Sequence, residues 1–113
     1  MQVIEILKKI KKSDILVSQK VRKKIEDKGL DVDKVLDKIF DFENLKIDAK
    51  QNGSYELIYD YSGKFNLVVI LFINDTVRLA TAWKSSKAID KLLKKATHIY
   101  DYRKKITLNK ANK

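Results

Sequence analysis

The sequence contains no cysteine and no proline, and its 113 residues include only three glycines and one histidine. Without cysteine, a disulfide scaffold and a thiolate metal site are both excluded. A zinc site is not expected either, because His98 is the single imidazole of the chain. The fold therefore has to be held together by a hydrophobic core, and we predict no metal.

Long hydrophobic runs are also missing. The longest, residues 67–73, is the length of a strand, whereas a membrane helix needs roughly 18 apolar residues. Residues 1–10 mix apolar and lysine side chains and lack the apolar stretch of a signal peptide. We therefore expect a cytoplasmic protein without a membrane partner.

The common catalytic motifs are absent. The chain has no G-x-G-x-x-G, no P-loop, no G-x-S-x-G and no H-E-x-x-H. A Ser-His-Asp triad would have to use His98, which lies among charged residues near the end of the chain. The sequence thus predicts no cofactor and leaves open whether the protein is an enzyme.

Positive charge is what the sequence has in excess. The net charge is +10, and residues 84–113 account for +8 of it, with 10 basic and 2 acidic residues. Such a distribution favours a polyanionic partner, with nucleic acid ahead of an anionic membrane surface. Arg103, Lys104 and Lys105 open a last segment without acidic residues and are candidate nucleic-acid contacts. The alternative is that the excess charge only aids solubility.

The first part of the chain has the apolar spacing of helices, over residues 2–12, 19–28 and 32–40. Ser18 and Asp31 are suited to cap the second and third helices. Gly29 is well placed to end the second helix in the left-handed conformation. The short apolar stretch at residues 15–17 is either a brief strand or a lead into the second helix.

The second part changes to the period of strands. Strands rich in β-branched and aromatic residues are predicted at 55–61, 65–73 and 76–84, with a further strand starting at 45–47. Short turn dipeptides separate them, so the sheet should be an antiparallel meander of three to four strands. The strand at 65–73 is apolar on both faces and should therefore be central, with both faces covered.

A last helix is predicted from residue 87 to about residue 100. The chain then reads as a single α+β domain over residues 1–102: N-terminal helices, an antiparallel meander and a C-terminal helix. Residues 103–113 are predicted to form a basic, flexible tail.

A basic stripe on the second predicted helix is the first candidate site. Lys20, Lys24 and Lys28 recur every four residues and therefore align on one face, with Arg22 and Lys23 beside them. A row of this kind can follow a phosphate backbone. The alternative is an ordinary solvated helix face.

Aromatic residues at one end of the sheet are the second candidate. If both hairpins have two-residue loops, Tyr59, Asn66 and Trp83 are cross-strand neighbours, with Thr81 two residues along. Aromatic rings there could stack bases while nearby cations such as Lys84 hold phosphates. The alternative is the rim of an ordinary core.

Arg78 is the third candidate, as the charged residue inside the last predicted strand. One interpretation is a structural ion pair with Asp60 or Glu56 across the sheet. The other is a catalytic arginine that stabilises the charge building on a scissile phosphate, as a metal-independent ribonuclease requires.

Residues 18–30, S-Q-K-V-R-K-K-I-E-D-K-G-L, resemble the opening motif S-x-H-A-x-x-R-x-x-x-R-G-I of a family of small prokaryotic proteins grouped with RelE/ParE-like toxins. The serine, the glycine and the aliphatic residue after it match. Residues 55–61 and 77–83 are also similar to later stretches of that family. The chain departs from the motif where the family has histidine and two arginines, because it has Lys20, Lys24 and Lys28.

The resemblance implies a RelE-like fold and cleavage of messenger RNA without a metal. In this chain, Arg78 and Lys24 would then stabilise phosphate charge, Tyr59 or Tyr61 would move protons, and Trp83 would stack a base.

Three hypotheses follow from these features. The first is an RNA-directed RelE-like protein, an endoribonuclease toxin in its active version, with RNA ahead of DNA as the partner. The second is a nucleic-acid-binding module without catalysis, in which the basic C-terminal segment dominates. The third is an interaction protein, in which a homodimer partner or an antitoxin peptide covers one face of the central strand.

Overall fold

The computed structural model describes residues 2–42, 45–49, 53–62, 65–86, 98–101 and 106–109. Helical segments come first along the chain: α1 (Gln2–Lys9), a 3₁₀ turn (Lys12–Asp14), α2 (Gln19–Asp27) and α3 (Val32–Ile39). A two-residue strand, β1 (Ile15–Leu16), precedes α2. The other strands are β2 (Leu45–Ala49), β3 (Ser54–Ser62), β4 (Phe65–Ile73), β5 (Val77–Ser85), β6 (His98–Asp101) and β7 (Ile106–Asn109).

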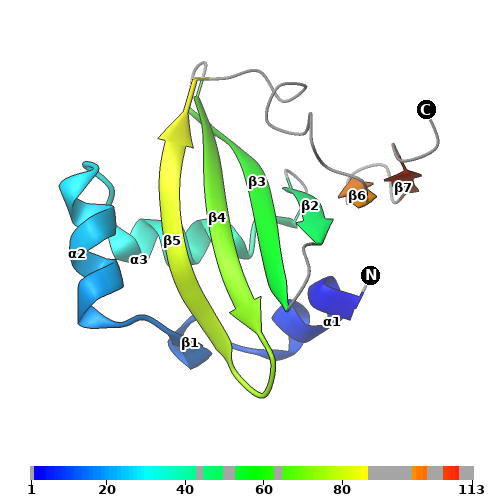
Figure 1. The fold of residues 1–113 in the computed structure, drawn as a ribbon, viewed down its shortest axis with the longest axis horizontal. Helices are drawn as coiled ribbons and strands as arrows, with labels where there is room; N and C mark the ends of the chain where they lie inside the picture. Colours follow the sequence, from blue (N-terminus) through cyan, green and yellow to red (C-terminus); the bar gives the residue numbers. More distant parts are fainter. Residues whose placement is uncertain are drawn as a thin grey trace.

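The strands form one seven-stranded sheet in the order β1-β5-β4-β3-β2-β6-β7. Neighbouring strands are antiparallel except β1 and β5, which are parallel. The α+β class and the antiparallel meander from β2 to β5 are therefore confirmed. The sheet as a whole is mixed, because the stretch at residues 15–17 contributes β1. Helix α3 crosses one face of the sheet and α2 lies beside β5 (Figure 1).

The C-terminal part differs from the prediction. Residues 98–100, expected at the end of a helix, belong to β6, which pairs with β2. The rest of that predicted helix, residues 87–97, lies outside the described residues. Within the predicted flexible tail, residues 106–109 form β7 against β6. The apolar spacing of residues 87–100 favours an amphipathic helix, but helical periodicity carries no information on the long-range pairing of residues 98–101 with β2.

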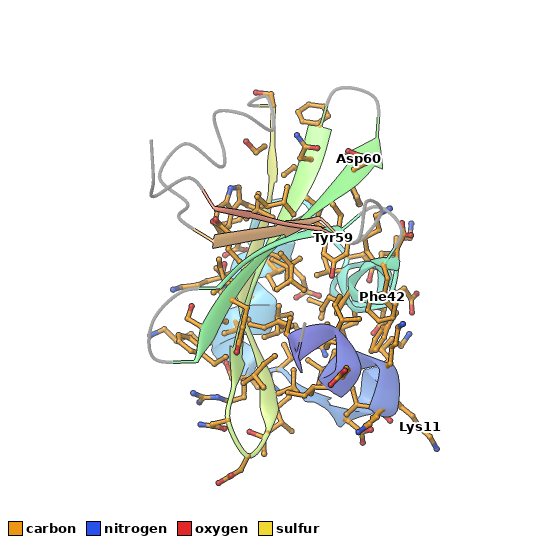
Figure 2. The ribbon with its side chains drawn as sticks, turned by 90° about the vertical axis from the view of Figure 1, so that its right-hand side faces the viewer. Lys11, Phe42, Tyr59 and Asp60 are labelled. Carbon is orange, nitrogen blue, oxygen red and sulfur yellow. The ribbon has the colours of Figure 1, made fainter. Side chains whose placement is uncertain are left out.

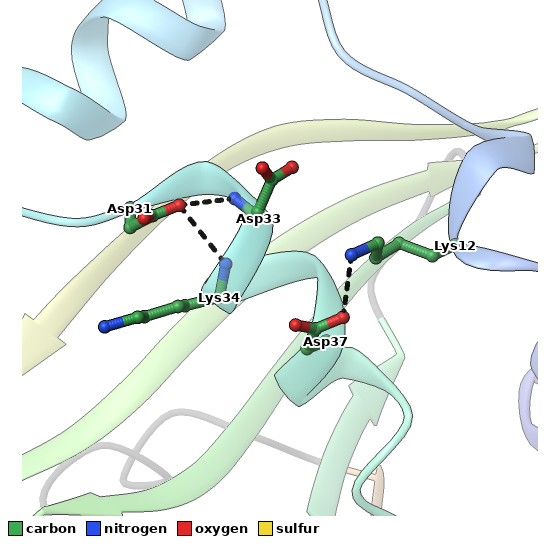
Figure 3. Close-up of polar contacts among 5 residues, drawn as sticks. All are labelled: Lys12, Asp31, Asp33, Lys34 and Asp37. Carbon is green, nitrogen blue, oxygen red and sulfur yellow. Dashed lines mark hydrogen bonds and ion pairs between the residues drawn. The ribbon is translucent and has the colours of Figure 1, made fainter.

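Local capping signals set the helix boundaries as predicted. The Ser18 hydroxyl accepts a hydrogen bond from the Val21 amide at 3.1 Å, and Gly29 follows α2 with φ +79°. At the start of α3, the Asp31 carboxylate accepts from the amides of Asp33 and Lys34 at 2.9 and 3.4 Å (Figure 3). These bonds satisfy amides that a helix cannot pair within itself.

Asp31→Ala should lower the free energy of unfolding by about 1 kcal/mol, because it removes the α3 cap. Asp37→Ala is a matched control in the same helix. Asp37 forms an exposed ion pair with Lys12 at 2.9 Å, and their hydrogen bond raises the pKa of Lys12 (Figure 3). Exposed pairs contribute little, so this variant should lose less. Urea unfolding compares the two, and equal losses would argue against the cap.

One hydrophobic cluster lies between the helices and one face of the sheet. It joins Val3 and Leu7 of α1, Ile25 of α2 and the apolar face of α3 to Leu57, Leu67, Val69, Leu71 and Leu79 of the strands. On the opposite face, Ile58 and Val68 are also buried. The prediction that β4 lies inside the sheet is therefore confirmed, but its second face is covered only in part, because Ile70 is half-buried and Phe72 is 37% exposed.

The strand register differs from the prediction by one residue between β3 and β4. Tyr59 pairs with Leu67, and Asp60 pairs with Asn66, because a bulge between Asp60 and Ser62 lengthens β3. Cross-strand partners point to the same face. Tyr59 is thereby placed with the core residue Leu67, away from Asn66.

The register between β4 and β5 differs from the prediction, but the side chains at the end of β5 still lie on the predicted face. Ile73 pairs with Val77, so three residues form the turn, one more than the predicted dipeptide. A second irregularity, between Ile70 and Leu71, adds one more residue on β5, so Trp83 pairs with Val68 and not with Asn66 as predicted. As a result, Thr81 and Trp83 share the face of Ile70 and Val68, as predicted.

Candidate nucleic-acid interface

Lys28 joins the basic stripe of α2 to the aromatic end of β5. It is the residue that caps the C-terminus of α2. Its ammonium donates a hydrogen bond to the Thr81 hydroxyl at 3.4 Å and lies 5.7 Å from the centre of the Trp83 ring. Helix α2 runs beside β5 in Figure 1, which makes this reach possible. The basic stripe and the aromatic end of the sheet, predicted as separate candidates, are therefore neighbours in space.

The other lysines of the stripe are open to solvent. Lys20, Lys23 and Lys24 are exposed, while Arg22 is half-buried. Within the described part of the chain, no acidic group lies in ion-pair distance of Lys20, Lys24 or Lys28. Their charge is therefore available to a polyanion.

Lys84 forms a second cation–aromatic pair, with a ring that sequence reasoning did not include. Its ammonium lies 5.4 Å from the centre of the Phe65 ring, and Phe65 is 40% exposed. Lys84 pairs with the core residue Leu67, so it points to the face opposite Trp83. The predicted register also placed Lys84 and Phe65 on one face, but the sequence analysis considered Lys84 only as a phosphate contact.

Arg78 lies at the other end of β5 and has different neighbours from those expected. Its guanidinium carbon is 5.8 Å from the centre of the Phe72 ring, and Leu16 of β1 is its partner on the other side. Strand β4 separates β5 from β3, so Arg78 does not face Asp60 or Glu56. The predicted ion pair across the sheet is wrong.

Tyr59 is part of the core. Its side chain is fully buried, and its hydroxyl donates a 2.7 Å hydrogen bond to the carbonyl of Ile39 at the end of α3. Burial, together with the negative charge of Asp41, raises the pKa of Tyr59 well above its usual value. Figure 2 shows Tyr59 between the sheet and the helices. The ring has no access to a substrate.

The four residues predicted as a catalytic set are not brought together. Tyr61 is half-buried and packs against the same core as Tyr59. Arg78 points to the opposite face of the sheet, with Phe72. Lys24 projects into solvent from α2. The one-residue shift between β3 and β4 accounts for Tyr59, since the predicted register placed it beside Asn66.

Three further predictions concern the basic residues after β6, a metal site and a membrane-spanning helix. Arg103, Lys104 and Lys105 lie outside the described residues. Among those described, no three His, Cys, Asp or Glu side chains are grouped so that they could hold a metal ion. No helix within the described ranges is long and apolar enough to cross a membrane.

Comparison with known proteins assigns no family to this arrangement. No family model matches the chain, and neither a curated protein nor a solved structure matches it. The resemblance of residues 18–30 to RelE/ParE-like toxins therefore stays a prediction.

Proposed function

We propose that this protein binds single-stranded RNA along the α2–β5 flank, the surface formed by Lys20, Lys24, Lys28, Thr81 and Trp83. The observation that carries the proposal is the contact of Lys28 with both Thr81 and Trp83. It connects a row of cations to an aromatic ring, which is the combination that single-strand binding requires.

Each part of the flank has a distinct task. Lys20 and Lys28 are eight residues apart, so their Cα atoms are separated by about 12 Å along the helix, and the row can contact several phosphates. A base stacked on an aromatic ring such as Trp83 contributes about 1–3 kcal/mol. The Thr81 hydroxyl beside the ring offers a partner for a ribose 2′-hydroxyl, which favours RNA ahead of DNA.

Binding without cleavage is the function that the geometry supports best. Proton transfer to and from the reacting oxygens needs a group within hydrogen-bond reach. The two tyrosines considered for that task pack against the core, while Arg78 lies on the opposite face. The RelE-like ribonuclease remains the alternative, and a cleavage assay separates the two.

Removing the lysine row should weaken RNA binding strongly. We expect the triple variant Lys20→Gln, Lys24→Gln, Lys28→Gln to lose about 100-fold in affinity at low salt. The slope of log K against log salt should fall by about 2, since each phosphate contact on a single strand contributes about 0.7. Fluorescence anisotropy of a labelled 12-nucleotide RNA measures both, and quenching of Trp83, the single tryptophan, reports contact at the ring.

The matched control removes three exposed lysines elsewhere: Lys9→Gln, Lys11→Gln, Lys34→Gln. It has the same net charge as the first variant but keeps the flank. Equal losses in the two triple variants would show that only net charge matters and would contradict the proposal. RNA fragments produced by the wild type in EDTA, and lost in Arg78→Ala, would instead establish the ribonuclease.

A further inference from the structure

A cleft of about 460 Å³ lies where β5 passes the end of β1 and the start of α2. Its walls are mainly apolar and include Leu16, Val17, Val21, Phe72 and Leu79, and Arg78 lines it as well. The volume falls in the range of small-molecule sites, about 300–1,000 Å³. Two of its apolar residues are unusually open to solvent, with Leu16 49% and Phe72 37% exposed.

Among the described residues that line the cleft, Arg78 is the only charged one. Among the described residues it has no acidic partner and no hydrogen bond from its guanidinium, and its contact is the ring of Phe72. Stacking on an aromatic face holds a guanidinium while leaving its N–H donors free. An arginine in this state matches a carboxylate, which it can bind through two parallel hydrogen bonds.

We propose that the cleft binds a small apolar molecule that carries one carboxylate. The carboxylate would pair with Arg78, and the apolar body would cover Leu16, Val21 and Leu79. One cation in the lining matches one negative charge, whereas a phosphate monoester carries about 1.5 to 2 charges at neutral pH. Covering the exposed apolar side chains supplies the rest of the affinity.

This site is independent of the proposed RNA surface. The cleft and the flank share no lining residue, and Lys28 meets Thr81 and Trp83 near one end of β5, whereas Arg78 pairs with β1 at the other end. The aliphatic walls suit a hydrocarbon body better than a sugar–phosphate chain. A failure of RNA binding would therefore leave the cleft proposal untouched, and the reverse also holds.

The test is a titration of the ¹⁵N-labelled full chain with octanoate and with octanamide, which has the same tail but no charge. With octanoate, amide signals of residues 16–18 and 78–80 should shift and saturate. Octanamide should bind at least about 10-fold more weakly, because it lacks the charge-assisted hydrogen bonds. Arg78→Gln should weaken octanoate by a similar factor, while Lys84→Gln should not change it.

Three results would overturn the proposal. One is equal affinity for octanoate and octanamide, which needs no variant and so does not depend on how Arg78→Gln folds. Another is saturable shifts only at residues outside the cleft, or none at all. The third is displacement of octanoate by the 12-nucleotide RNA, which would make the cleft part of the RNA surface.

Discussion

Gly53→Ala should lower the free energy of unfolding by about 3 kcal/mol, whereas Gly29→Ala should lower it by about 1 kcal/mol. Both glycines have positive φ, +75° and +79°. A side chain in that conformation costs roughly 1–2 kcal/mol, partly offset by the reduced freedom of the unfolded chain. This contribution is common to the two variants.

Steric contact makes the difference between them. A Cβ atom at Gly53 would lie 2.8 Å from the carbonyl oxygen of Ile73, while one at Gly29 would meet nothing within 4 Å. The Gly53 carbonyl also accepts the Ile73 amide at 2.9 Å, so the two backbones cannot separate without losing that bond. Forcing an extra group into such a contact costs about 1–3 kcal/mol. Urea unfolding of both variants measures the gap, and equal losses would mean that the hairpin relaxes freely.

The features that could be predicted from the sequence are those encoded locally. Ser18 and Asp31 cap the helices that follow them, and Gly29 ends α2, because each acts on amides or dihedral angles a few residues away. The apolar pattern of β4 likewise identified a central strand. The row Lys20, Lys24, Lys28 also depends only on helical spacing.

The register of the sheet could not be predicted in the same way. A bulge inserts one residue and moves every later side chain to the other face. The bulge at Asp60 and Ser62 sends Tyr59 into the core, while the shift at Ile70 and Leu71 returns Trp83 to its predicted face. Packing of the whole sheet decides where such shifts occur. No local residue pattern in the sequence predicted the shift in β3 or the shift in β5.

The site was predicted in parts for the same reason. Helix spacing gave the basic stripe and strand composition gave Trp83, but the approach of α2 to β5 is a tertiary contact. The parallel pairing of β1 with β5, which creates the cleft at Arg78, involves two residues on each strand. The apolar stretch at residues 15–17 allowed a brief strand, but so short a segment does not indicate which strand it pairs with.

Tyr59→Phe should lower the free energy of unfolding by about 1–3 kcal/mol and leave RNA affinity unchanged. The Ile39 carbonyl lies at the end of α3, where helical carbonyls lack partners within the helix, and the Tyr59 hydroxyl satisfies it at 2.7 Å. Removing the hydroxyl leaves that buried acceptor unpaired. Tyr61→Phe is the control, because Tyr61 is half-buried beside the same core. A loss of RNA binding in folded Tyr59→Phe would contradict the assignment of Tyr59 to the core.

The dependence of the free energy of unfolding on pH above 10 tests the Tyr59 hydroxyl through its titration. Burial raises the pKa of Tyr59 in the folded state, while the unfolded chain has the usual tyrosine value of about 10. Below about pH 10 both states hold the phenol proton, and the stability from this group is complete. As pH rises further, only the unfolded state loses the proton, so the wild type loses up to about 1.4 kcal/mol per pH unit. Tyr59→Phe lacks this loss, so the stability gap between wild type and variant should narrow between pH 10 and 11.5. Parallel curves for the two proteins would mean that Tyr59 ionises equally in both states and that its hydroxyl is open to water.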